Sequence, residues 1–548
     1  MEHFDAAVIG AGQSGLYTTY RLKVEGLSVV GIDGGAGFGG VWHHNGYPGA
    51  RIDSDSVDYS LQFSKELYEK WRWHERYSDA PTLQNYHNFV ADELGVRDDF
   101  RFNTRLEGAV WSSVTQRWHL STSNGDQIRV QFLIMCTGSL GAPKKLAFAG
   151  LERFKGQWAQ TAHWPREGVD VEGRKVAVIG TGSSGVQSIP ALAQDADQLT
   201  VFQRHPHWSI PARNRPLGSA EQDAVASTLG DAVRMSYRDF LPVDAATVDA
   251  LALNQPGSPR AFASGEAARP ASSYTPAQRR DVLEKQWEFG GHGLTYVFSD
   301  TTTNLESNQY VTDFIREMTI ERIGDSRLAE RLTPNYPAGT KRLILDIDYY
   351  EAYSRDNVDL VSVLETPIVE LTETGVRTTA GDHEADLVVF ALGFRAFIGP
   401  LEDAGIRNEA GTTVADVWSN GPRTLFGLMT PGFPNMFHVT NAGSPSVLGN
   451  AMLLAEFLGD WIAECITHVR SQGFSSIEAS DAASEEWMHT VDGYAQELYP
   501  IRRAENQYMV HVNDDGSRFF QPFSGGMKEY VLHVHRATEQ GYAGFTLT

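Results

Sequence analysis

Two glycine-rich turns, each placed between a short apolar run and a helical pattern, constrain the fold of this chain more than any other feature. The first turn follows the apolar run Ala6–Ile9 and consists of Gly10, Ala11, Gly12, Gln13, Ser14 and Gly15. The second follows Lys175–Ile179 and consists of Gly180, Thr181, Gly182, Ser183, Ser184 and Gly185. Such a turn lets the backbone approach a pyrophosphate and presents the free N–H groups of a helix N-terminus. The chain is therefore predicted to be an α/β protein with two Rossmann-like dinucleotide-binding domains.

The residue that follows the second strand of each unit differs between the two, and this difference separates the ligands. In the first unit the apolar run Leu27–Ile32 ends at Asp33, whose carboxylate can accept hydrogen bonds from ribose hydroxyls. In the second unit Leu199–Phe202 leads to Arg204, and an arginine fork binds a 2′-phosphate that a carboxylate would repel. We therefore expect FAD in the first unit and NADPH in the second. The alternative for Arg204 is a solvated surface charge without a ligand.

Two dinucleotide units in one chain are typical of flavoproteins that take a hydride from NADPH. Such proteins are either reductases that pass electrons to a disulfide or a protein, or oxygenases that pass them to O2. A disulfide reductase needs paired cysteines beside the flavin, whereas this chain has only Cys136 and Cys465, which are far apart in sequence. We therefore expect an oxygenase, in which both cysteines are small buried apolar residues.

The charge balance and the apolar runs exclude several kinds of partner. The formal net charge is −23, from 46 basic and 69 acidic residues, so the phosphates of nucleic acids and anionic membranes are repelled. The chain has no apolar run of about 18 residues and no basic N-terminal region, so we expect a cytoplasmic protein without a membrane span. His43-His44 and the pair His533 and His535 lack a third ligand at standard spacing, so we expect no metal site. The sequence leaves the oligomeric state open, and a monomer is compatible with it.

One segment between the two units carries a family signature. Residues 154–165 read Phe-Lys-Gly-Gln-Trp-Ala-Gln-Thr-Ala-His-Trp-Pro, which resembles the fingerprint Phe-x-Gly-x-x-x-His-x-x-x-Trp-Pro of type I Baeyer–Villiger monooxygenases. Further segments that resemble this family, and its phenylacetone and cyclohexanone monooxygenase group, follow in order over nearly the whole chain: Gly39–Trp42, Tyr47–Asp53, Val201–Arg204, Tyr336–Arg342, Ala391–Phe394, Gly443–Ser446 and Pro522–Gly526. The resemblance implies an FAD- and NADPH-dependent enzyme. Such an enzyme inserts one oxygen atom of O2 beside a ketone carbonyl, giving an ester or lactone through a C4a-peroxyflavin.

The resemblance also implies the roles of individual residues. It places Arg342 over the flavin, where a charge that cannot be lost would stabilise the deprotonated peroxide, and Asp53 would hold its guanidinium. Gly40 and Trp42 would pack near the flavin, and Lys341 would assist at the 2′-phosphate. Without their flanking segments, Lys341 and Arg342 would be interpreted as an exposed basic pair and Asp53 as a turn residue.

Two departures from the family pattern bear on coupling and on the substrate. The fingerprint histidine is Gln160 here, and His163 lies three positions later. In the family that histidine is implicated in the coupled motions around NADP. Near the C-terminus the family's Trp-Tyr is Gln507-Tyr508, and the loop up to Phe519 is longer. Because that loop covers the nicotinamide and the substrate in relatives, we expect an unusual ketone.

The order of the segments predicts how the chain is divided. Residues 1–150 and 391–548 would form the FAD-binding domain, the latter with the C-terminal loop region. Residues 151–215 and 333–390 would form the NADP-binding domain, with a helical insertion over 216–332. Gln255–Pro259 would break structure early in the insertion, and Thr275-Pro276 would begin a helix. Val311, Phe314, Ile315 and Met318 have helical spacing further on.

Two other functions stay open. A related flavin oxygenase would hydroxylate nitrogen or oxidise sulfur with the same two cofactors, although a soft nucleophile reacts with the protonated peroxide. Lys341-Arg342 and Asp53 favour the peroxy anion and therefore a ketone. A flavoprotein sensor without turnover is the other alternative, because the fingerprint and the C-terminal loop depart from the family pattern.

Overall fold

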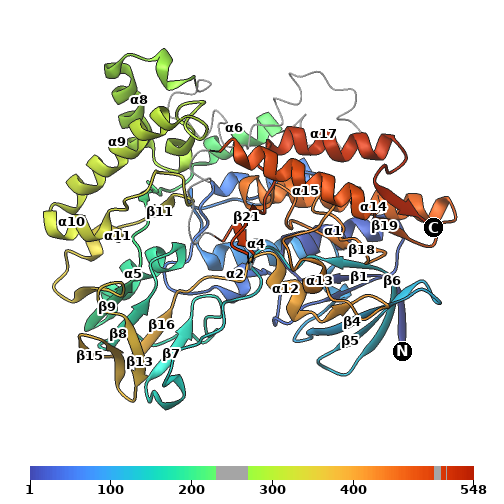
Figure 1. Ribbon diagram of the computed structural model, residues 1–548, viewed down its shortest axis with the longest axis horizontal. Coiled ribbons are helices and arrows are strands. Elements are labelled where there is room, and N and C mark those ends of the chain that lie inside the picture. Colours follow the sequence, from blue (N-terminus) through green and yellow to red (C-terminus); the bar gives the residue numbers. More distant parts are fainter. Residues whose placement is uncertain (230–268, 499–507, 514) are drawn as a thin grey trace.

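Two separate sheets, each containing one of the glycine-rich units, organise the chain. The structure is a computed structural model that describes residues 1–229, 269–498, 508–513 and 515–548. The sheets lie side by side in the lower half of Figure 1, and most of the longer helices lie above them. The predicted breaker Gln255–Pro259 and the departure at Gln507 lie outside the described residues.

The first sheet has eight strands in the order β17-β4-β5-β6-β1-β2-β3, with β18 paired to β6. Its strands are β1 (Glu2–Ile9), β2 (Val29–Ile32), β3 (Phe100–Arg101), β4 (Leu106–Ser112), β5 (Arg117–Thr122), β6 (Gln127–Met135), β17 (Ile406–Arg407) and β18 (Met436–His438). β1 lies between β2 and β6 in parallel, with Ile9 opposite Ile32 and Met135. The first glycine-rich turn therefore leaves from the carboxyl end of a central strand, where Rossmann folds bind their ligands.

The second sheet has five strands in the order β12-β9-β8-β16-β7. Its strands are β7 (Gln157–Gln160), β8 (Lys175–Ile179), β9 (Gln198–Gln203), β12 (Val358–Ser362) and β16 (Leu387–Phe390). All its pairings are parallel, and β8 and β16 are buried almost throughout, as expected for strands covered on both faces. The prediction of two Rossmann-like units is confirmed, while the domain boundaries themselves stay predictions.

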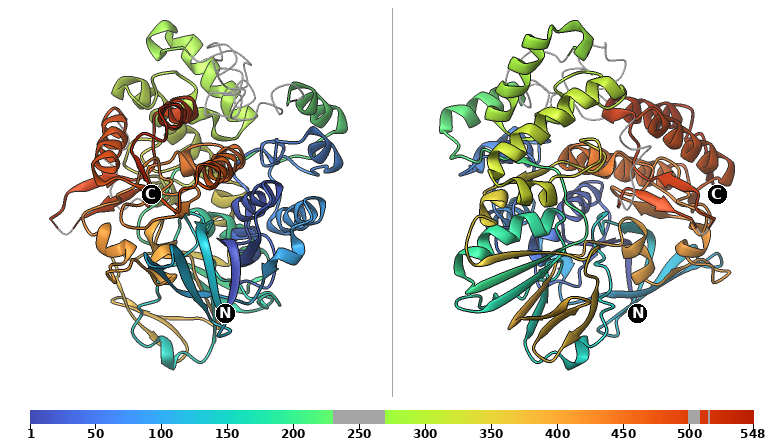
Figure 2. Two further views of the ribbon diagram at one scale, coloured as in Figure 1. Left: turned by 90° about the vertical axis from the view of Figure 1, so that its right-hand side faces the viewer. Right: turned by 60° about the vertical axis from the view of Figure 1, so that its left-hand side comes forward.

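Helices cover these sheets and connect them. The helices of the two sheet regions are α1 (Gln13–Val24), α2 (Val41–His44), α3 (Lys65–Lys70), α4 (Ala80–Glu93), α5 (Ser183–Asp195), α11 (Tyr349–Ala352), α12 (Ile398–Asp403) and α13 (Val414–Val417). The C-terminal helices are α14 (Ala451–Ser471), α15 (Asp481–Gln496) and α17 (Gly526–Glu539). α14 packs so tightly on α1 that a Cβ on Gly459 would lie 2.8 Å from the ring of Tyr17. Figure 2 shows the C-terminal helices gathered over the first sheet.

The predicted helical insertion is confirmed in the part of it that is described. It contains α6 (Ser219–Leu229), α8 (Pro276–Phe289), α9 (Leu305–Ile323) and α10 (Ser326–Leu332). Thr275 caps α8 in a capping box with Gln278, so the sequence signal for this helix start was sound. On α9, Val311, Phe314 and Ile315 are buried, as their helical spacing predicted.

Short strands complete the fold. They are β10 (Ser209–Pro211) with β11 (Ile344–Asp346), β13 (Ile368–Thr372) with β14 (Gly375–Thr378) and β15 (Gly381–Glu384), β19 (Ile477–Ala479) with β22 (Phe545–Leu547), and β20 (Val510–Val512) with β21 (Arg518–Phe520). None of the helices in the described ranges combines the length and the hydropathy that a membrane span requires. Cys136 and Cys465 are both unpaired and buried, as expected, and burial raises the pKa of Cys136 to about 12.

Gly182 and Gly185 of the second glycine-rich turn should differ in how well they tolerate a side chain. A Cβ on Gly185 would lie 2.2 Å from the carbonyl oxygen of Gly180, whereas one on Gly182 would meet nothing within 4 Å. We expect Gly185→Ala to lower the free energy of unfolding by about 1–3 kcal/mol or more, the usual cost of overpacking. Gly182→Ala is the matched control, and thermal unfolding of the two purified variants measures the difference. Equal melting temperatures would contradict this account of the turn.

Candidate functional site

The first glycine-rich turn forms a cradle in which side chains have no room. Gly10 has a φ of +113°, and a Cβ on it would lie 2.4 Å from the carbonyl oxygen of Cys136. A Cβ on Gly15 would lie 1.8 Å from the carbonyl oxygen of Gly10. α1 begins within this turn, at Gln13, with Gly12 as N-cap, no side-chain cap and no acidic residue in its first turn. The N–H groups at this helix end are therefore open to an anionic group, such as a pyrophosphate.

Two polar side chains complete this cradle. Asp33 Oδ2 accepts a hydrogen bond from the N–H of Ala11 at 2.6 Å, and Oδ1 accepts one from the N–H of Gly35 at 2.6 Å. Because each carboxylate oxygen has a further lone pair, a contact between Asp33 and a ribose hydroxyl stays a prediction. The amide of Gln13 is buried, and neither its nitrogen nor its oxygen has a hydrogen-bond partner among the described residues. A buried amide without partners is costly, so this turn fits a ligand that supplies them.

The second turn repeats the geometry of the first. Gly180 also has a φ of +113°, and its Cβ would lie 2.4 Å from the carbonyl oxygen of Ala391. α5 begins at Ser183 with Gly182 as N-cap, again without a side-chain cap. Thr181 donates its hydroxyl hydrogen to the carbonyl oxygen of His205 at 3.1 Å, which ties the turn to the end of β9. The two turns present equivalent surfaces for two dinucleotides.

The segment Tyr47–Asp53 links the two turns, because it belongs to the first half of the chain and docks on α5 of the second unit. The hydroxyl of Tyr47 donates to Gln187 Oε1 at 2.7 Å, and Gln187 Nε2 donates to the carbonyl oxygen of Arg51 at 3.0 Å. Gly49 has a φ of +82°, and a Cβ there would lie 2.2 Å from the carbonyl oxygen of Gln187. Asp53, which ends this segment, is thereby carried to the boundary between the two units.

Arg342 meets Asp53 at this boundary. Arg342 Nε donates to Asp53 Oδ2 at 2.6 Å and a terminal nitrogen donates to Oδ1 at 3.1 Å, so the pair is bidentate across 289 residues of sequence. The side chains of Arg342 and Asp53 keep 37% and 42% of their surface exposed. A tightly paired arginine that retains this much open surface can still present a fixed charge to a bound group.

The electrostatics of the pair keep both partners charged. Burial alone would raise the pKa of the Asp53 carboxyl. The charge of Arg342 and the hydrogen bonds that the carboxylate accepts outweigh burial and hold this pKa below its usual range. Burial acts to lower the pKa of Arg342, and the charge and hydrogen bonds of Asp53 reverse this and raise it. Neither group therefore changes protonation near neutral pH.

Of three further residues beside this pair, His292 and Tyr296 were not found from the sequence, and Tyr508 was noted only as part of the C-terminal departure. Nε2 of His292 lies 3.5 Å from Asp53 Oδ2. Tyr296 and Tyr508 lie within electrostatic reach of Arg342, and burial followed by the opposing charge of Arg342 leaves both with a raised pKa. The pair Gly290-Gly291 before His292 was the only local signal that could have drawn attention to this loop.

Trp42 and Gly40 lie against the first cradle. A Cβ on Gly40, whose φ is +53°, would lie 3.0 Å from the Cα of Gly12, so the backbone at Gly40 is in close contact with the first glycine-rich turn. The indole N–H of Trp42 donates to the hydroxyl of Tyr59 at 2.6 Å. Burial raises the pKa of Tyr59 to about 12, with a further contribution from Asp53. Trp42 is thus tied to a tyrosine that lies within electrostatic reach of Asp53, and its packing against a flavin stays a prediction.

Arg204 and Lys341 come together around one histidine. Burial, and then the charges of Lys341, His205 and Arg204, lower the pKa of His207 to about 3. Tyr336 joins the two chain segments, since its hydroxyl donates to the carbonyl oxygen of Pro206 at 3.1 Å. The structure therefore forms a local cluster of positive charge at the end of β9, as a 2′-phosphate would require.

The departure at Gln160 has a defined place. Gln160 Nε2 donates to the carbonyl oxygen of Lys144 at 2.9 Å, which ties β7 to the connection that leaves the first sheet. Gln160 also forms an isolated bridge with His163. His163 in turn contacts the ring of His44 on α2, with ring centroids 5.2 Å apart. The position is thus a link between the two halves, made here through an amide.

Other polar clusters do not resemble a cofactor site. His43 is buried, and its ring nitrogens contact the N–H of Ala36 and the side chains of Gln84 and Arg166. No group of three His, Cys, Asp or Glu side chains suited to a metal ion occurs within the described residues.

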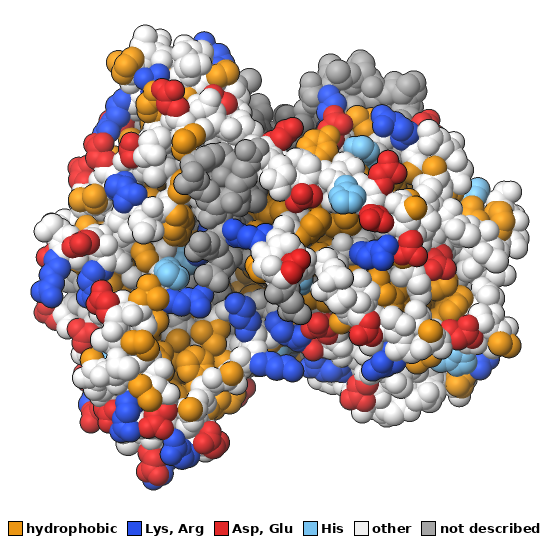
Figure 3. All heavy atoms as spheres, in the orientation of Figure 1, with side chains coloured by type: hydrophobic (Ala, Val, Ile, Leu, Met, Phe, Trp, Pro, Cys, Tyr) orange, Lys and Arg blue, Asp and Glu red, His pale blue; other side chains and the backbone are white. Residues whose placement is uncertain are grey.

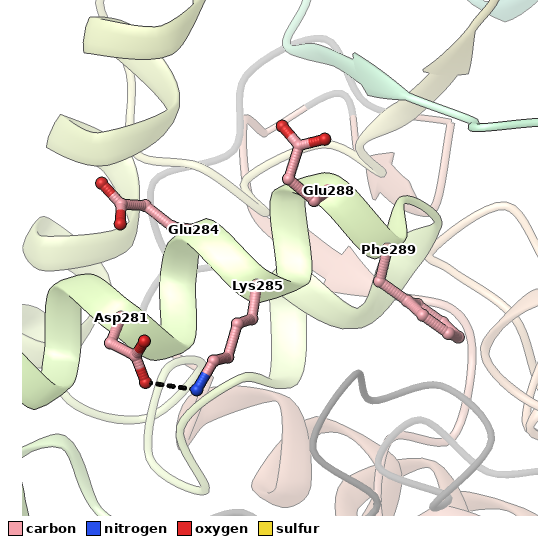
Figure 4. Close-up of a pocket in the computed structure, with 5 residues that line it drawn as sticks. All are labelled: Asp281, Glu284, Lys285, Glu288 and Phe289. Atoms are coloured by element: carbon pink, nitrogen blue, oxygen red, sulfur yellow. Dashed lines mark hydrogen bonds and ion pairs between the residues drawn. The ribbon is translucent and has the colours of Figure 1, made fainter.

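A hollow on α8 (Figure 4) is lined by Asp281, Glu284, Lys285, Glu288 and Phe289. Its excess of carboxylates would repel phosphates, whereas Figure 3 shows Lys and Arg side chains gathered along the cleft between the two halves.

Comparison with known proteins identifies the family. Residues 4–221 match the family described as flavin-binding monooxygenase-like. A cyclopentanone 1,2-monooxygenase from Comamonas sp. (strain NCIMB 9872) is 36% identical over 100% of this chain and 96% of that protein. A Baeyer–Villiger monooxygenase from Pseudooceanicola batsensis is 35% identical over 98% of this chain and 95% of that protein. A phenazine N-monooxygenase from Lysobacter antibioticus is 34% identical over 100% of this chain and 97% of that protein.

Solved structures extend this likeness to the whole fold. A steroid monooxygenase bound to NADP is 38% identical with a TM-score of 0.88, over 100% of this chain and 99% of that chain. The complex of OTEMO with FAD and NADP is 30% identical with a TM-score of 0.89, over the same shares of the two chains. The two cradles described above correspond in number to the two cofactors in that complex. This chain therefore belongs to the Baeyer–Villiger monooxygenases within the flavin-binding monooxygenase-like family, and it is a flavin monooxygenase that uses FAD and NADPH.

Proposed function

We propose that this enzyme converts a small-molecule ketone to an ester or lactone, and that Arg342 and Asp53 are its catalytic pair. The observation that carries this proposal is the bidentate contact of Arg342 with Asp53, in which the guanidinium keeps 37% of its surface exposed. The pair lies at the boundary between the two dinucleotide units. This is where a flavin bound to the first unit and a nicotinamide bound to the second would approach each other.

The charge of Arg342 suits this reaction. When bound, FAD reduced by NADPH supplies the electrons that activate O2. Attack on a ketone carbonyl requires the reacting oxygen to stay negatively charged, and a cation fixed beforehand stabilises that charge without reorganisation. Since the pKa of Arg342 is raised, this residue cannot quench the oxygen by giving up a proton. Asp53 fixes the orientation of the guanidinium and leaves its remaining N–H groups for the reacting oxygen.

The cofactor contacts follow from the same geometry. Gly10, Gly12, Ser14 and Gly15 with the amide of Gln13 would hold the FAD pyrophosphate, and Asp33 its ribose. Thr181, Ser183 and Ser184, with the glycines of the second turn, would hold the NADPH pyrophosphate. Arg204 and Lys341 would bind the 2′-phosphate, which is supported by the fact that both charges lie near enough to His207 to lower its pKa.

Nitrogen oxygenation is the second candidate function, because one relative at 34% identity is named a phenazine N-monooxygenase. The three relatives named above are all monooxygenases by name, which argues against a sensor without turnover. NADPH-dependent O2 uptake with product analysis separates the candidates, using cyclic and open-chain ketones, an aromatic N-heterocycle and a sulfide. Ester or lactone is the expected product. N-oxide formation without any ester from the ketone panel would overturn the ketone proposal.

Replacing Arg342 tests the reaction class. At about 4 Å and an effective dielectric near 20, the attraction between two unit charges is roughly 4 kcal/mol. We therefore expect Arg342→Ala to slow oxygen insertion by about two to three decades, since each ~1.4 kcal/mol is tenfold. Flavin reduction by NADPH should change much less. The electrons should then reduce O2 to hydrogen peroxide, which is released in place of ester. Stopped-flow reduction and ester yield measure the two halves separately.

The controls for this experiment are chosen by exposure and pairing. Arg280→Ala removes an arginine of similar exposure that pairs with Glu284 and Glu317 on the insertion. It should leave ester yield near that of the wild type. Asp53→Ala should resemble Arg342→Ala but with a smaller loss, because the charge remains and only its orientation is lost. Full ester yield from Arg342→Ala would remove this residue from the mechanism.

Coenzyme preference tests the second unit. Each charge-assisted contact to a 2′-phosphate is worth roughly 1.5–3 kcal/mol, so Arg204→Ala should reduce the preference for NADPH over NADH by about one to two decades. Arg213→Ala, at an exposed arginine paired with Glu288, is the control. The ratio of kcat/KM for the two coenzymes reports the effect. An unchanged ratio in Arg204→Ala would show that this arginine is a solvated surface charge.

A further inference from the structure

The Arg342–Asp53 pair has a third member that comes from the helical insertion. Asp53 Oδ2, which accepts from Arg342 Nε at 2.6 Å, also lies 3.5 Å from Nε2 of His292. This nitrogen is buried and has no hydrogen-bond partner among the described residues. At 3.5 Å the contact is mainly electrostatic, and Oδ2 is the anionic atom that faces this nitrogen. Arg342 and His292 therefore both contact the same carboxylate oxygen of Asp53.

The loop that presents His292 is held in one conformation. Gly290 and Gly291 have φ values of +75° and +77°, which residues with side chains rarely adopt. The N–H of Gly291 donates to the carbonyl oxygen of Pro211 at 3.1 Å. A Cβ on Gly291 would lie 2.5 Å from the hydroxyl of Tyr77, so the backbone passes that residue without room for a side chain. The position of the imidazole therefore follows from fixed backbone.

The segment that carries Asp53 also anchors the end of α8. Asp55 accepts a hydrogen bond from Arg76 Nε at 2.6 Å, and both side chains are largely buried. A terminal nitrogen of Arg76 donates to the carbonyl oxygen of Phe289 at 2.7 Å, and the guanidinium lies 4.5 Å from the ring of Phe289. Asp53 and Asp55 thus reach the insertion at two places, one through His292 and one through Arg76.

The groups that face His292 determine its charge. Asp53 and Asp55 are the nearby anions and Arg342 is the nearby cation, while Arg76 lies beside Gly291. Burial and then the charge of Arg342 lower the pKa of His292 below its ordinary value, and Asp53 acts in the opposite direction. His292 is therefore neutral at pH 7 and gains a proton only in acid solution, where Asp53 remains ionised because its own pKa is lowered.

We propose that His292 is a positioning residue: in its neutral form it orients Asp53 against Arg342, and when protonated it competes with Arg342 for the same carboxylate oxygen. This inference rests on the role proposed for Arg342 and Asp53. The sign follows from the charges, since an imidazolium next to Asp53 repels the guanidinium and shares its counter-ion. The result in acid solution is a guanidinium held less firmly over the reacting oxygen, and a larger share of O2 released as hydrogen peroxide.

The first test reads the titration of His292 directly. In the holoenzyme with 13C-labelled histidine, the NMR signal that disappears in His292→Gln belongs to this residue. Asp53→Asn should lower the pKa of His292 by about 1 or more, because it removes an adjacent anion. Arg342→Gln should raise the pKa, because it removes an adjacent cation. Opposite displacements are expected only for a histidine coupled to both charges, and a pKa that moves in neither variant overturns the proposal.

The second test reads the consequence for coupling. In the wild type the peroxide released per NADPH should rise about threefold or more as the pH falls through the pKa measured for His292. His292→Ala should raise peroxide release at pH 7.5, and His292→Gln, which keeps a neutral polar side chain beside Asp53, should show little of that rise. His292→Gln should also lack the acid rise. His119→Gln is the matched control, since burial and the charge of Arg129 also lower the pKa of His119, far from the pair.

The outcomes separate this inference from the proposed function. Ester formation by the wild type with the same acid rise in His292→Gln overturns the positioning role and leaves the catalytic pair intact. Absence of ester from every ketone overturns the proposed function, whereas the NMR displacements still decide whether His292 is coupled to Asp53 and Arg342. Opposite displacements together with loss of the acid rise support the inference.

Discussion

The close contact between Gly49 and Gln187 determines how near the two dinucleotide units come to each other. The backbone of Gly49 passes so close to α5 that no side chain fits, and Gln187 binds the backbone of Arg51 on the same face. Since hydride transfer and oxygen activation need two cofactors in contact, an enzyme of this kind depends on that approach. The same contact carries Asp53 to the boundary, four residues after Gly49, where Arg342 arrives from the other half of the chain.

Features encoded by neighbouring residues were predictable from the sequence. β8 has the predicted bounds, and α8 starts after Thr275 as its capping signal indicates. The sequence predicted strand bounds less well where the length of a strand depends on pairing with a neighbouring strand. β1 was expected over the apolar run Ala6–Ile9 but begins at Glu2, because Glu2 and His3 pair with β6 although they are polar. β17 and β18 were not predicted, since two or three residues paired to strands some 300 positions away have no periodicity of their own.

The residues of the candidate site likewise divide into those that the local sequence predicts and those that depend on distant contacts. The glycines of both turns were evident because their spacing reflects backbone geometry, which local sequence encodes directly. The partners of Asp53 could only be suggested by resemblance, because the contact with Arg342 joins residues 289 positions apart. His292 had no signal of its own, since its relation to Asp53 exists only once α8 has been placed against the segment after residue 50. The contact of Asp33 with a ribose stays a prediction, and its carboxylate binds the N–H groups of Ala11 and Gly35, which the sequence did not suggest.

The formal charge of −23 and the basic cleft are consistent with each other when the charges are considered one at a time. Many acidic residues of the described ranges, such as Glu284, Glu317 and Glu373, form ion pairs at the surface, where each ion pair contributes little and is screened by salt. Asp53 and Asp55 differ because they lie where the two halves and the insertion meet, and each binds one arginine at that place. Asp55 uses Arg76 to hold the end of α8, and Asp53 orients Arg342. The insertion therefore reaches the candidate active site through two aspartates of one short segment, so a displacement of α8 would act on the segment that holds Arg342.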